Sequence, residues 1–284
     1  MLKVKDLEFK YAKSGTKAIK GIDFEIQDGE VFGFLGPSGS GKTTTQRLLI
    51  GLLKGYTGSV EVFGRERSTW KREYFEKIGV AFDFPNLYLK LTAKENLKVI
   101  GSYYRKGATA IDALLDSVGL LPYRDQKVEG YSKGMKMRLN FVRSILHDPE
   151  FLFFDEPTSG LDPVNAKIIK DIILSLKAKG KTVFLTTHNM TVAEQLCDRV
   201  AFLVEGKIPV CDTPESLKLK YGKKTIKVEY QDNGMTMTDE FPLDGFNKRD
   251  GLVEILNSKE IKTIHSQEAT LEDIFIRLTG KELI

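Results

Sequence analysis

The segment at residues 36–43 constrains the fold of this chain more than any other part of the sequence. It reads GPSGSGKT and fits the pattern G-x-x-x-x-G-K-[ST]. An apolar run at residues 31–35 precedes it, and a stretch with helical character at residues 43–53 follows it. Glycines at these spacings let main-chain N–H groups wrap around phosphate oxygens, and a helix that starts here directs its positive end at the same anion. The sequence therefore predicts a strand, a phosphate-binding loop and a helix, the opening of an α/β fold.

Individual residues of this loop have separate tasks on a nucleoside triphosphate. Lys42 supplies a positive charge to the β- and γ-phosphates, and the Thr43 hydroxyl is a ligand for Mg²⁺. We therefore expect ATP and Mg²⁺ as cofactors. The residues expected to contact the nucleotide in this segment are Gly36, Pro37, Ser38, Gly39, Ser40, Gly41, Lys42, Thr43 and Thr44.

A second apolar run, at residues 151–154, ends in the carboxylates Asp155 and Glu156. This run is apolar at every position, as in a strand that is buried on both faces of a sheet. A helical pattern at residues 164–179 and another apolar run at residues 182–186 follow it. Strand, helix and strand in this order predict a parallel sheet. We expect Asp155 to hold Mg²⁺ and Glu156 to act as general base for the water that attacks the γ-phosphate.

The order and spacing of these motifs resemble the nucleotide-binding subunit of an ABC transporter, and the resemblance covers residues 1 to about 217. By this resemblance Tyr11 stacks on the adenine ring. His188 resembles the switch histidine of the family, which contacts the γ-phosphate. The expected catalytic residues are therefore Glu156, His188 and Lys42.

The signature segment of that family has a counterpart at residues 131–135, which read YSKGM where the family usually has LSGGQ. Ser132 and Gly134 match the pattern, and the resemblance implies that they face the γ-phosphate held by a second subunit. The segment SGLD at residues 159–162 resembles the loop that lies across the same interface. The expected assembly is a homodimer, or a heterodimer with a closely related ABC ATPase, with ATP enclosed between the two chains.

Two positions depart from the family pattern. The family normally has a glutamine after the strand near residues 80–82, where this chain has Asp83, so we expect a carboxylate in place of an amide at the Mg²⁺ site. Lys133 replaces the first glycine of the signature, and Met135 replaces its glutamine. Together with the C-terminal segment at residues 269–280, this signature resembles bacterial exporter subunits that pair with ABC-2-type permeases. The expected metal ligands are Thr43, Asp83 and Asp155.

These patterns predict an α/β fold of the P-loop NTPase class. We expect a mainly parallel sheet as the core, an antiparallel β-subdomain at the N-terminus, a helical subdomain over about residues 86–147 and a small C-terminal α+β accessory domain. The predicted domains are an ABC-type ATP-binding domain at residues 1–218 and the accessory domain at residues 219–284. Asp28 and Gly29, between the second and third strand-like runs, predict a β-hairpin.

Composition limits the partners that we expect. The net charge is +4 and the charged residues of both signs are interspersed, so no nucleic-acid-binding face is indicated. No apolar stretch approaches the roughly 18 residues of a membrane-spanning helix, and the N-terminus does not read as a signal peptide. The two cysteines indicate neither a metal site nor a disulfide framework. We expect a cytoplasmic chain that lies peripherally on the inner face of the cell membrane, with an integral membrane permease as partner.

Three alternatives to an exporter subunit are weighed on the sequence. A non-transport ABC ATPase for DNA repair or chromosome organisation carries a long coiled coil, and a translation factor carries two ATPase modules; this chain has neither pattern. An importer subunit would differ in its permease and in a soluble binding protein, which this sequence does not display. A regulator without turnover is disfavoured by Glu156 and His188. For an exporter, the expected substrate is a drug-like molecule, a peptide or a lipid.

Overall fold

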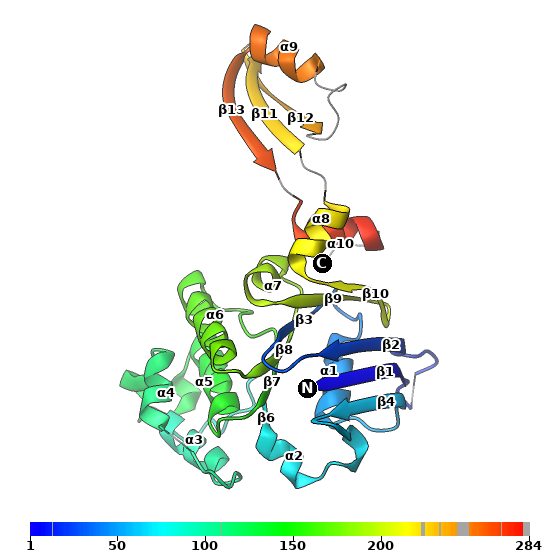
Figure 1. Cartoon of the computed structure of the whole chain (residues 1–284). Helices are drawn as coiled ribbons and strands as arrows, with labels where there is room; N and C mark the ends of the chain where they lie inside the picture. Colours follow the sequence, from blue (N-terminus) through cyan, green and yellow to red (C-terminus); the bar gives the residue numbers. More distant parts are fainter. Residues whose placement is uncertain are drawn as a thin grey trace. The chain divides into compact units, whose positions relative to one another are not determined.

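The computed structural model of the chain describes residues 1–12, 14–108, 110–222, 225–232, 234–242, 250–267 and 269–280 (Figure 1). Contacts between residues divide the chain into two compact units, of which the first covers Met1–Asp212 and the second begins at Thr213. Within these described ranges, no helix combines the length and the hydropathy that crossing a bilayer requires.

A mainly parallel sheet forms the centre of the first unit. Its strands, in spatial order, are β10 (Lys207–Asp212), β9 (Arg199–Val204), β3 (Val31–Leu35), β8 (Thr182–Thr187), β7 (Phe151–Asp155) and β6 (Ile78–Ala81). All neighbouring pairs are parallel except β10 with β9. Every residue of β3, β7 and β8 is buried, as the continuous apolar runs predict. Because the strands are parallel, the carboxyl ends of β3, β7 and β8 meet at one edge, where the phosphate loop also begins.

An antiparallel sheet lies beside the central sheet. Its order is β2 (Ile19–Ile26), β1 (Leu2–Phe9), β4 (Thr57–Val62) and β5 (Arg65–Glu66). The predicted hairpin at Asp28 and Gly29 is wrong: β2 pairs with β1, whereas β3 pairs with β8 and β9. The turn instead carries the chain from one sheet to the other. The burial of β2 alternates, as on a half-exposed sheet, while β3 is buried on both faces, so the two strands belong to different layers.

One hydrophobic core joins the two sheets. The Phe24 ring of β2 stacks on the Phe32 ring of β3 with centroids 5.6 Å apart, and Phe184 of β8 packs against both. Leu48 and Leu49 of α1 (Lys42–Ile50) are fully buried in the same cluster. The helix that follows the phosphate loop is therefore fixed by packing, and the position of the loop is fixed with it.

Three helices lie together on the side of the central sheet away from β1, β2 and β4 (Figure 1): α3 (Ala93–Gly101), α4 (Ile111–Ser117) and α5 (Lys133–Ile145). They fall within the predicted helical subdomain. A capping box between Thr92 and Glu95 starts α3, and Ser132 caps α5. The remaining helices of this unit are α2 (Arg72–Lys77), α6 (Pro163–Ala178), which Asp162 caps, and α7 (Met190–Leu196), which Asn189 caps.

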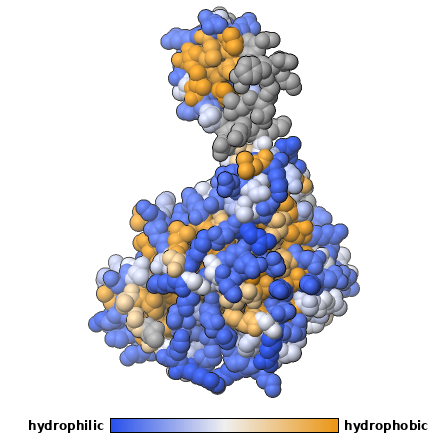
Figure 2. Space-filling model, in the orientation of Figure 1, coloured by the Kyte–Doolittle hydropathy of each residue, from blue (hydrophilic) through white to orange (hydrophobic). Residues whose placement is uncertain are grey.

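The second unit is α+β. It contains α8 (Pro214–Tyr221), β11 (Thr225–Asp232), β12 (Met235–Pro242), α9 (Asp250–Ser258), β13 (Glu260–Gln267) and α10 (Leu271–Thr279). The three strands form an antiparallel sheet in the order β12, β11, β13, and Leu252 of α9 packs with Val228 and Tyr230 in its core. Figure 2 shows an apolar area on this unit. The exposed large apolar side chains of the unit are Leu219, Met235, Met237, Val253, Leu256, Ile264 and Ile276.

The predicted domain boundary after residue 218 falls inside α8. The compact units divide after Asp212 instead, because α8 packs on α10 of the second unit. Arg277 of α10 donates a hydrogen bond to the carbonyl oxygen of Tyr221 at the end of α8, at 2.7 Å. The change in the sequence pattern marks where the β-strands of the second unit begin. The helix before them, α8, belongs to the same unit because of its packing on α10.

Candidate active site

The phosphate loop joins β3 to α1 in the predicted order. The N-cap of α1 is Gly41, with a φ of 115° and no side-chain hydrogen bond to the first turn, so the first N–H groups of the helix are free for an anion. A Cβ atom on Gly36 would lie 2.2 Å from the carbonyl oxygen of Leu203, and one on Gly41 would lie 2.7 Å from Ile19 Cδ1. The loop is thus pressed against its neighbours at two points where only glycine fits.

Lys42 is buried inside the loop that it follows. Its Nζ donates hydrogen bonds to the carbonyl oxygens of Gly36, at 2.6 Å, and Pro37, at 3.0 Å. Burial lowers the pKa of Lys42, and the negative charges of Glu156 and Asp155 oppose this effect. The Lys42 ammonium group could donate to a phosphate oxygen in place of one of these carbonyl oxygens.

Asp155 ends β7 and faces the start of α1. The Thr43 hydroxyl donates to its Oδ2 at 3.2 Å, and the Thr186 hydroxyl donates to its Oδ1. Burial raises the pKa of Asp155; the Thr186 hydrogen bond opposes this, and the nearby charge of Asp83 adds to it. A carboxylate, a hydroxyl and a negative environment suit a hard divalent cation, which would restore the charge balance.

The carboxylate of Glu156 is held in one orientation by three donors from the end of β8 and the residue after it. They are the Thr187 hydroxyl at 3.1 Å, the main-chain N–H of His188 at 2.9 Å and the His188 ring Nδ1 at 2.7 Å. Glu156 has a φ of 49°, in the left-handed region that a non-glycine residue rarely adopts. Such strain costs about 1–3 kcal/mol and clusters at functional sites. It turns the chain sharply after β7, and the Glu156 side chain lines the same cavity as the phosphate loop.

A cavity of about 630 Å³ brings most of the predicted residues together. Tyr11 lies at its edge, 38% exposed, and its hydroxyl is 3.0 Å from the Thr44 hydroxyl. The residues that line the cavity are Tyr11, Ala18, Ser38, Gly39, Gly41, Lys42, Thr43, Thr44, Asp83, Asp155, Glu156 and His188. Gly36 and Pro37 contribute through their hydrogen bonds to Lys42. Ser40 is buried with its hydroxyl oxygen unpartnered among the described residues.

The sequence interpretation did not include Ala18, Thr186 and Thr187. The two threonines hold Asp155 and Glu156, respectively. Their positions could have been inferred from the sequence, because parallel neighbouring strands bring their last residues together at one edge. Threonine is also a common strand residue, however, and nothing in its spacing distinguishes a hydrogen-bond donor from an ordinary strand former.

Ser132 and Gly134 do not line this cavity. The Ser132 hydroxyl accepts a hydrogen bond from the N–H of Met135 at 3.2 Å and so caps α5. Ser132 itself is exposed. The Lys133 side chain lies against Gly160 of the segment at 159–162, because a Cβ on Gly160 would be 3.4 Å from Lys133 Cε. The signature segment is therefore outside the nucleotide cavity of its own chain, on an exposed helix end.

The donor set limits how a metal could be held. Across the part of the chain that the structure describes, no group of three or more His, Cys, Asp or Glu residues could hold a metal by itself. Thr43, Asp155 and Asp83 nevertheless line one cavity with the phosphate loop. Mg²⁺ commonly uses one or two carboxylates together with substrate phosphates and water. These residues fit a metal that binds together with a nucleotide.

The phosphate loop follows a strand of a parallel sheet. At the same edge of the sheet lie Asp155, which suits a metal ion, and Glu156, which is held in one orientation. These features together define a P-loop ATPase. Comparison with known proteins agrees. Residues 19–159 match the family described as ABC transporter, and residues 224–268 match the fluoroquinolone efflux ABC transporter C-terminal domain.

Similar proteins extend the match to the whole chain. A fluoroquinolones export ATP-binding protein of Mycobacterium tuberculosis is 50% identical over 100% of this chain and 94% of its own length. The bacitracin transport ATP-binding protein of Bacillus licheniformis is 33% identical over 99% of this chain and 97% of its own length. A solved dimeric ATP-binding cassette, in a post-hydrolysis state with ADP and Pi, has a TM-score of 0.69 and 26% identity over 75% of this chain and 98% of its own. The chain belongs to the ABC transporter ATP-binding family and is an ATP-hydrolysing subunit.

Proposed function

We propose that this subunit energises export of a drug-like, peptide or lipid substrate through a separate membrane permease. The observation that carries the catalytic part is the Glu156 carboxylate, which three donors orient beside the cavity that the phosphate loop lines. The direction of transport is supported by the relative whose name describes fluoroquinolone export. The match of residues 224–268 to an efflux-type C-terminal domain supports the same direction.

The residues of the cavity divide the hydrolytic reaction among them. Lys42 and the free N–H groups of the loop bind the phosphates, and Tyr11 stacks on the adenine ring. Glu156 accepts a proton from the attacking water as its oxygen bonds to the γ-phosphorus, and the bond from phosphorus to the β-phosphate oxygen breaks. His188 holds the Glu156 carboxylate and contacts the γ-phosphate. Thr43, Asp155 and Asp83 would hold Mg²⁺, which neutralises phosphate charge when bound.

The signature segment would complete the site of a second chain. Ser132 is exposed at the start of α5 and lies outside the cavity of its own subunit, so its helix end is available to another nucleotide. The similar cassette that binds ADP and Pi is dimeric. We assign a head-to-tail homodimer, or a heterodimer with a related ABC ATPase, with Ser132 and Gly134 facing the partner's γ-phosphate.

A groove beside Asp83 fits contact with the permease. It has a volume of about 800 Å³ and is lined by residues 83–89 together with Lys133 and Lys136. Phe84 is 70% exposed, and Tyr88 and Leu89 are both 48% exposed, which is unusual for such large apolar side chains. Asp83 lines both this groove and the nucleotide cavity, so a partner seated here would respond to the nucleotide. Contact with a permease at this groove is consistent with our proposal that the subunit lies on the inner face of the cell membrane.

Glu156→Gln tests the catalytic assignment, with Glu150→Gln as matched control. Both acids flank β7, but Glu150 lies at its other end and pairs with Lys77. We expect Glu156→Gln to bind ATP as the wild type does and to lose at least about 100-fold in hydrolysis rate, since a general base contributes about 10²–10⁴-fold. Glu150→Gln should keep its rate. A Glu156→Gln protein with unchanged turnover would remove Glu156 from this role.

Transport direction needs the membrane partner. The chain would be co-expressed with the polytopic membrane protein encoded beside it, and ATP-dependent uptake of a fluoroquinolone, a peptide antibiotic or a labelled lipid would be measured in inside-out vesicles. Export predicts accumulation of at least one of these probes, and Glu156→Gln should abolish it. Accumulation only in right-side-out vesicles, dependent on a soluble binding protein, would indicate an importer.

A further inference from the structure

Two side chains of α5 hold the chain on either side of Asp83. The Asn140 side-chain Nδ2 donates a hydrogen bond to the carbonyl oxygen of Phe82 at 2.8 Å. Arg143, three residues further along the same helix, donates through Nη1 to the carbonyl oxygen of Asn86 at 2.5 Å. Residues spaced by three share one helix face, so both bonds come from the face that packs toward this segment.

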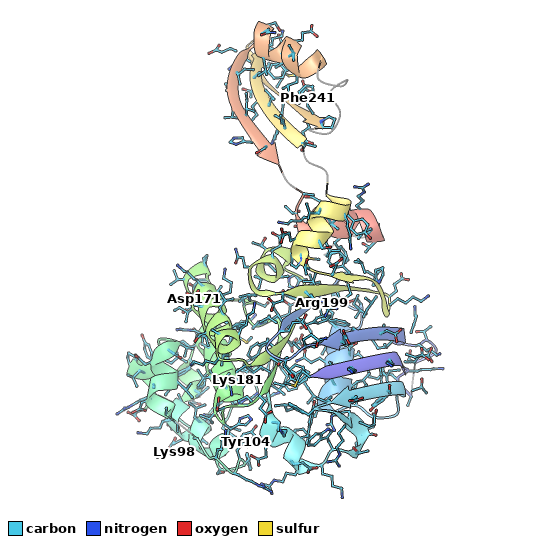
Figure 3. The ribbon with its side chains drawn as sticks, viewed as in Figure 1. Lys98, Tyr104, Asp171, Lys181, Arg199 and Phe241 are labelled. Carbon is cyan, nitrogen blue, oxygen red and sulfur yellow. The ribbon has the colours of Figure 1, made fainter. Side chains whose placement is uncertain are left out.

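A third contact anchors the strand that leads into the segment. His147, in the turn after α5, lies 2.9 Å through Nε2 from the carbonyl oxygen of Ile78 in β6. Its ring stacks on Tyr104, which is labelled in Figure 3, with centroids 3.6 Å apart. The helix also touches β6 directly: a Cβ on Gly79 would lie 2.0 Å from the carbonyl oxygen of Ser144. Helix α5 and β6 are therefore packed backbone to backbone.

The residues between the bonded carbonyl groups of Phe82 and Asn86 line the nucleotide cavity and the groove beside it. Asp83 lines the nucleotide cavity and the adjoining groove, while Phe84 lines the groove alone and is 70% exposed. The other end of the same helix carries Ser132. One helix thus connects an exposed signature end with the main chain on both sides of Asp83, which lines the nucleotide cavity.

Burial of Asn140 is not explained by stability alone. The residue is 1% exposed, and its Oδ1 has no hydrogen-bond partner among the described residues. A buried amide with an unpaired acceptor is costly, and an apolar residue of similar size would pack at this position without that cost. Among the described residues, the one hydrogen bond that the Asn140 side chain makes is to the carbonyl oxygen of Phe82.

We propose that Asn140 and Arg143 are positioning residues that clamp residues 82–86 to the signature helix. Movement of α5 on ATP-driven dimer closure then moves Asp83 in the cavity and Phe84 in the groove as one body. The inference rests on the proposed function for the roles of Asp83 and Ser132, but the clamp itself is a property of the single chain. It assigns to α5 the coupling between the partner's nucleotide and this chain's metal-side carboxylate.

Hydrogen exchange in the full-length chain tests the clamp without reference to activity. We expect Asn140→Leu to speed amide exchange of residues 83–87, apart from Pro85, which has no N–H, about tenfold, because one of the two hydrogen bonds that anchor this segment is lost. Arg143→Met, at a position less buried than Asn140, should do the same if Asn140→Leu folds poorly. The matched control is Ser144→Ala, a buried residue of the same helix whose hydroxyl donates a hydrogen bond to the carbonyl oxygen of Phe141 within α5. Wild-type exchange at residues 83–87 in both folded variants would refute the clamp.

A double-mutant cycle with Asp83→Gln tests whether Asn140 acts through Asp83. The quantity compared is the ratio of ATP dissociation constants in EDTA and in Mg²⁺. We expect Asn140→Leu to lower this ratio, and the double variant to match Asp83→Gln alone. Additive changes would show that Asn140 acts independently and would overturn the coupling. If Asp83→Gln alone left the ratio unchanged, the proposed metal role of Asp83 would fail, while the exchange experiment would still decide the clamp.

Discussion

At the scale of single residues, the site brings several carboxylates together and gives them few hydrogen-bond donors. Asp155 is buried and has a raised pKa, and within the described part of the chain its hydrogen-bond donors are only the Thr43 and Thr186 hydroxyls. Asp83 adds a third negative charge to the same cavity. A site with this charge distribution should bind the triphosphate poorly until a cation is present.

This charge excess predicts the effect of Asp83→Gln on nucleotide binding. Removing one negative charge should strengthen ATP binding in EDTA about fivefold, close to the 1 kcal/mol that a charge pair contributes at moderate separation in a wet site. Binding in Mg²⁺ should change less. Asp171→Asn, on the exposed face of α6 (Figure 3), removes the same charge far from the cavity and is the control. Isothermal titration calorimetry under both conditions measures the effect, and identical ratios for the wild type and Asp83→Gln would contradict it.

At the scale of elements, the sequence predicted those whose pattern is set by their own burial. The strands β3 and β7 are apolar at nearly every position because both faces of the central sheet are buried, and Ser132 marks the start of α5 because its hydroxyl caps the helix. The pairing of β2 was predicted wrongly. Asp28 and Gly29 define a turn, but a turn does not determine whether the next strand stays in the same sheet.

Contacts between elements were the part that the sequence did not reveal. Asn140 and Arg143 read as ordinary polar positions on a helix, since their acceptors are main-chain carbonyls that carry no side-chain signal. Thr187 likewise reads as a strand residue, although it orients Glu156. A motif that lies within one short segment of the sequence, such as the phosphate loop, can be predicted from the sequence. Bonds to distant main chain require the structure.

The end of α5 makes the stability of the first unit dependent on pH. Burial lowers the pKa of His147 below the usual 6.5, although its hydrogen bond to Ile78 and the charges of Glu76 and Asp148 oppose this. As the pH falls below about 6.5, the unfolded chain takes up a proton that folded His147 does not. The free energy of unfolding therefore falls with pH, by at most about 1.4 kcal/mol per unit for this group, and is not reduced by it above that pH.

His147→Gln should remove this dependence. Although the variant loses the Tyr104 stacking and should be less stable near neutral pH, its free energy of unfolding should fall less steeply between about pH 6.5 and 5. Urea unfolding followed by fluorescence of Trp70, the single tryptophan, reports the first unit. His265→Gln, an exposed histidine on β13, should keep the wild-type slope. An equal slope in His147→Gln would show that His147 does not bind its proton differently in the two states.

At the scale of the whole molecule, one chain carries the two proposed halves of the catalytic machinery on different surfaces. The cavity holds Lys42, Glu156 and His188, while Ser132 is exposed elsewhere. Two copies arranged head to tail would complete two sites, whereas a single copy leaves its nucleotide open to water on one side. The state in which ATP is bound and not hydrolysed should therefore be a dimer.

Association should depend on both ATP and the signature end. We expect Glu156→Gln to elute as a dimer in ATP and as a monomer in ADP, because blocked hydrolysis keeps the closed state populated. Adding Ser132→Arg should prevent the dimer, since a long side chain at the capping position occupies the space of the partner's γ-phosphate. Ser117→Arg, an exposed serine at the end of α4, is the matched control and should leave the dimer intact. Light scattering after size exclusion gives the mass directly. A Glu156→Gln protein that stays monomeric at saturating ATP, or a Ser132→Arg variant that still dimerises, would mean that the exposed end of α5 does not close over a second chain's nucleotide.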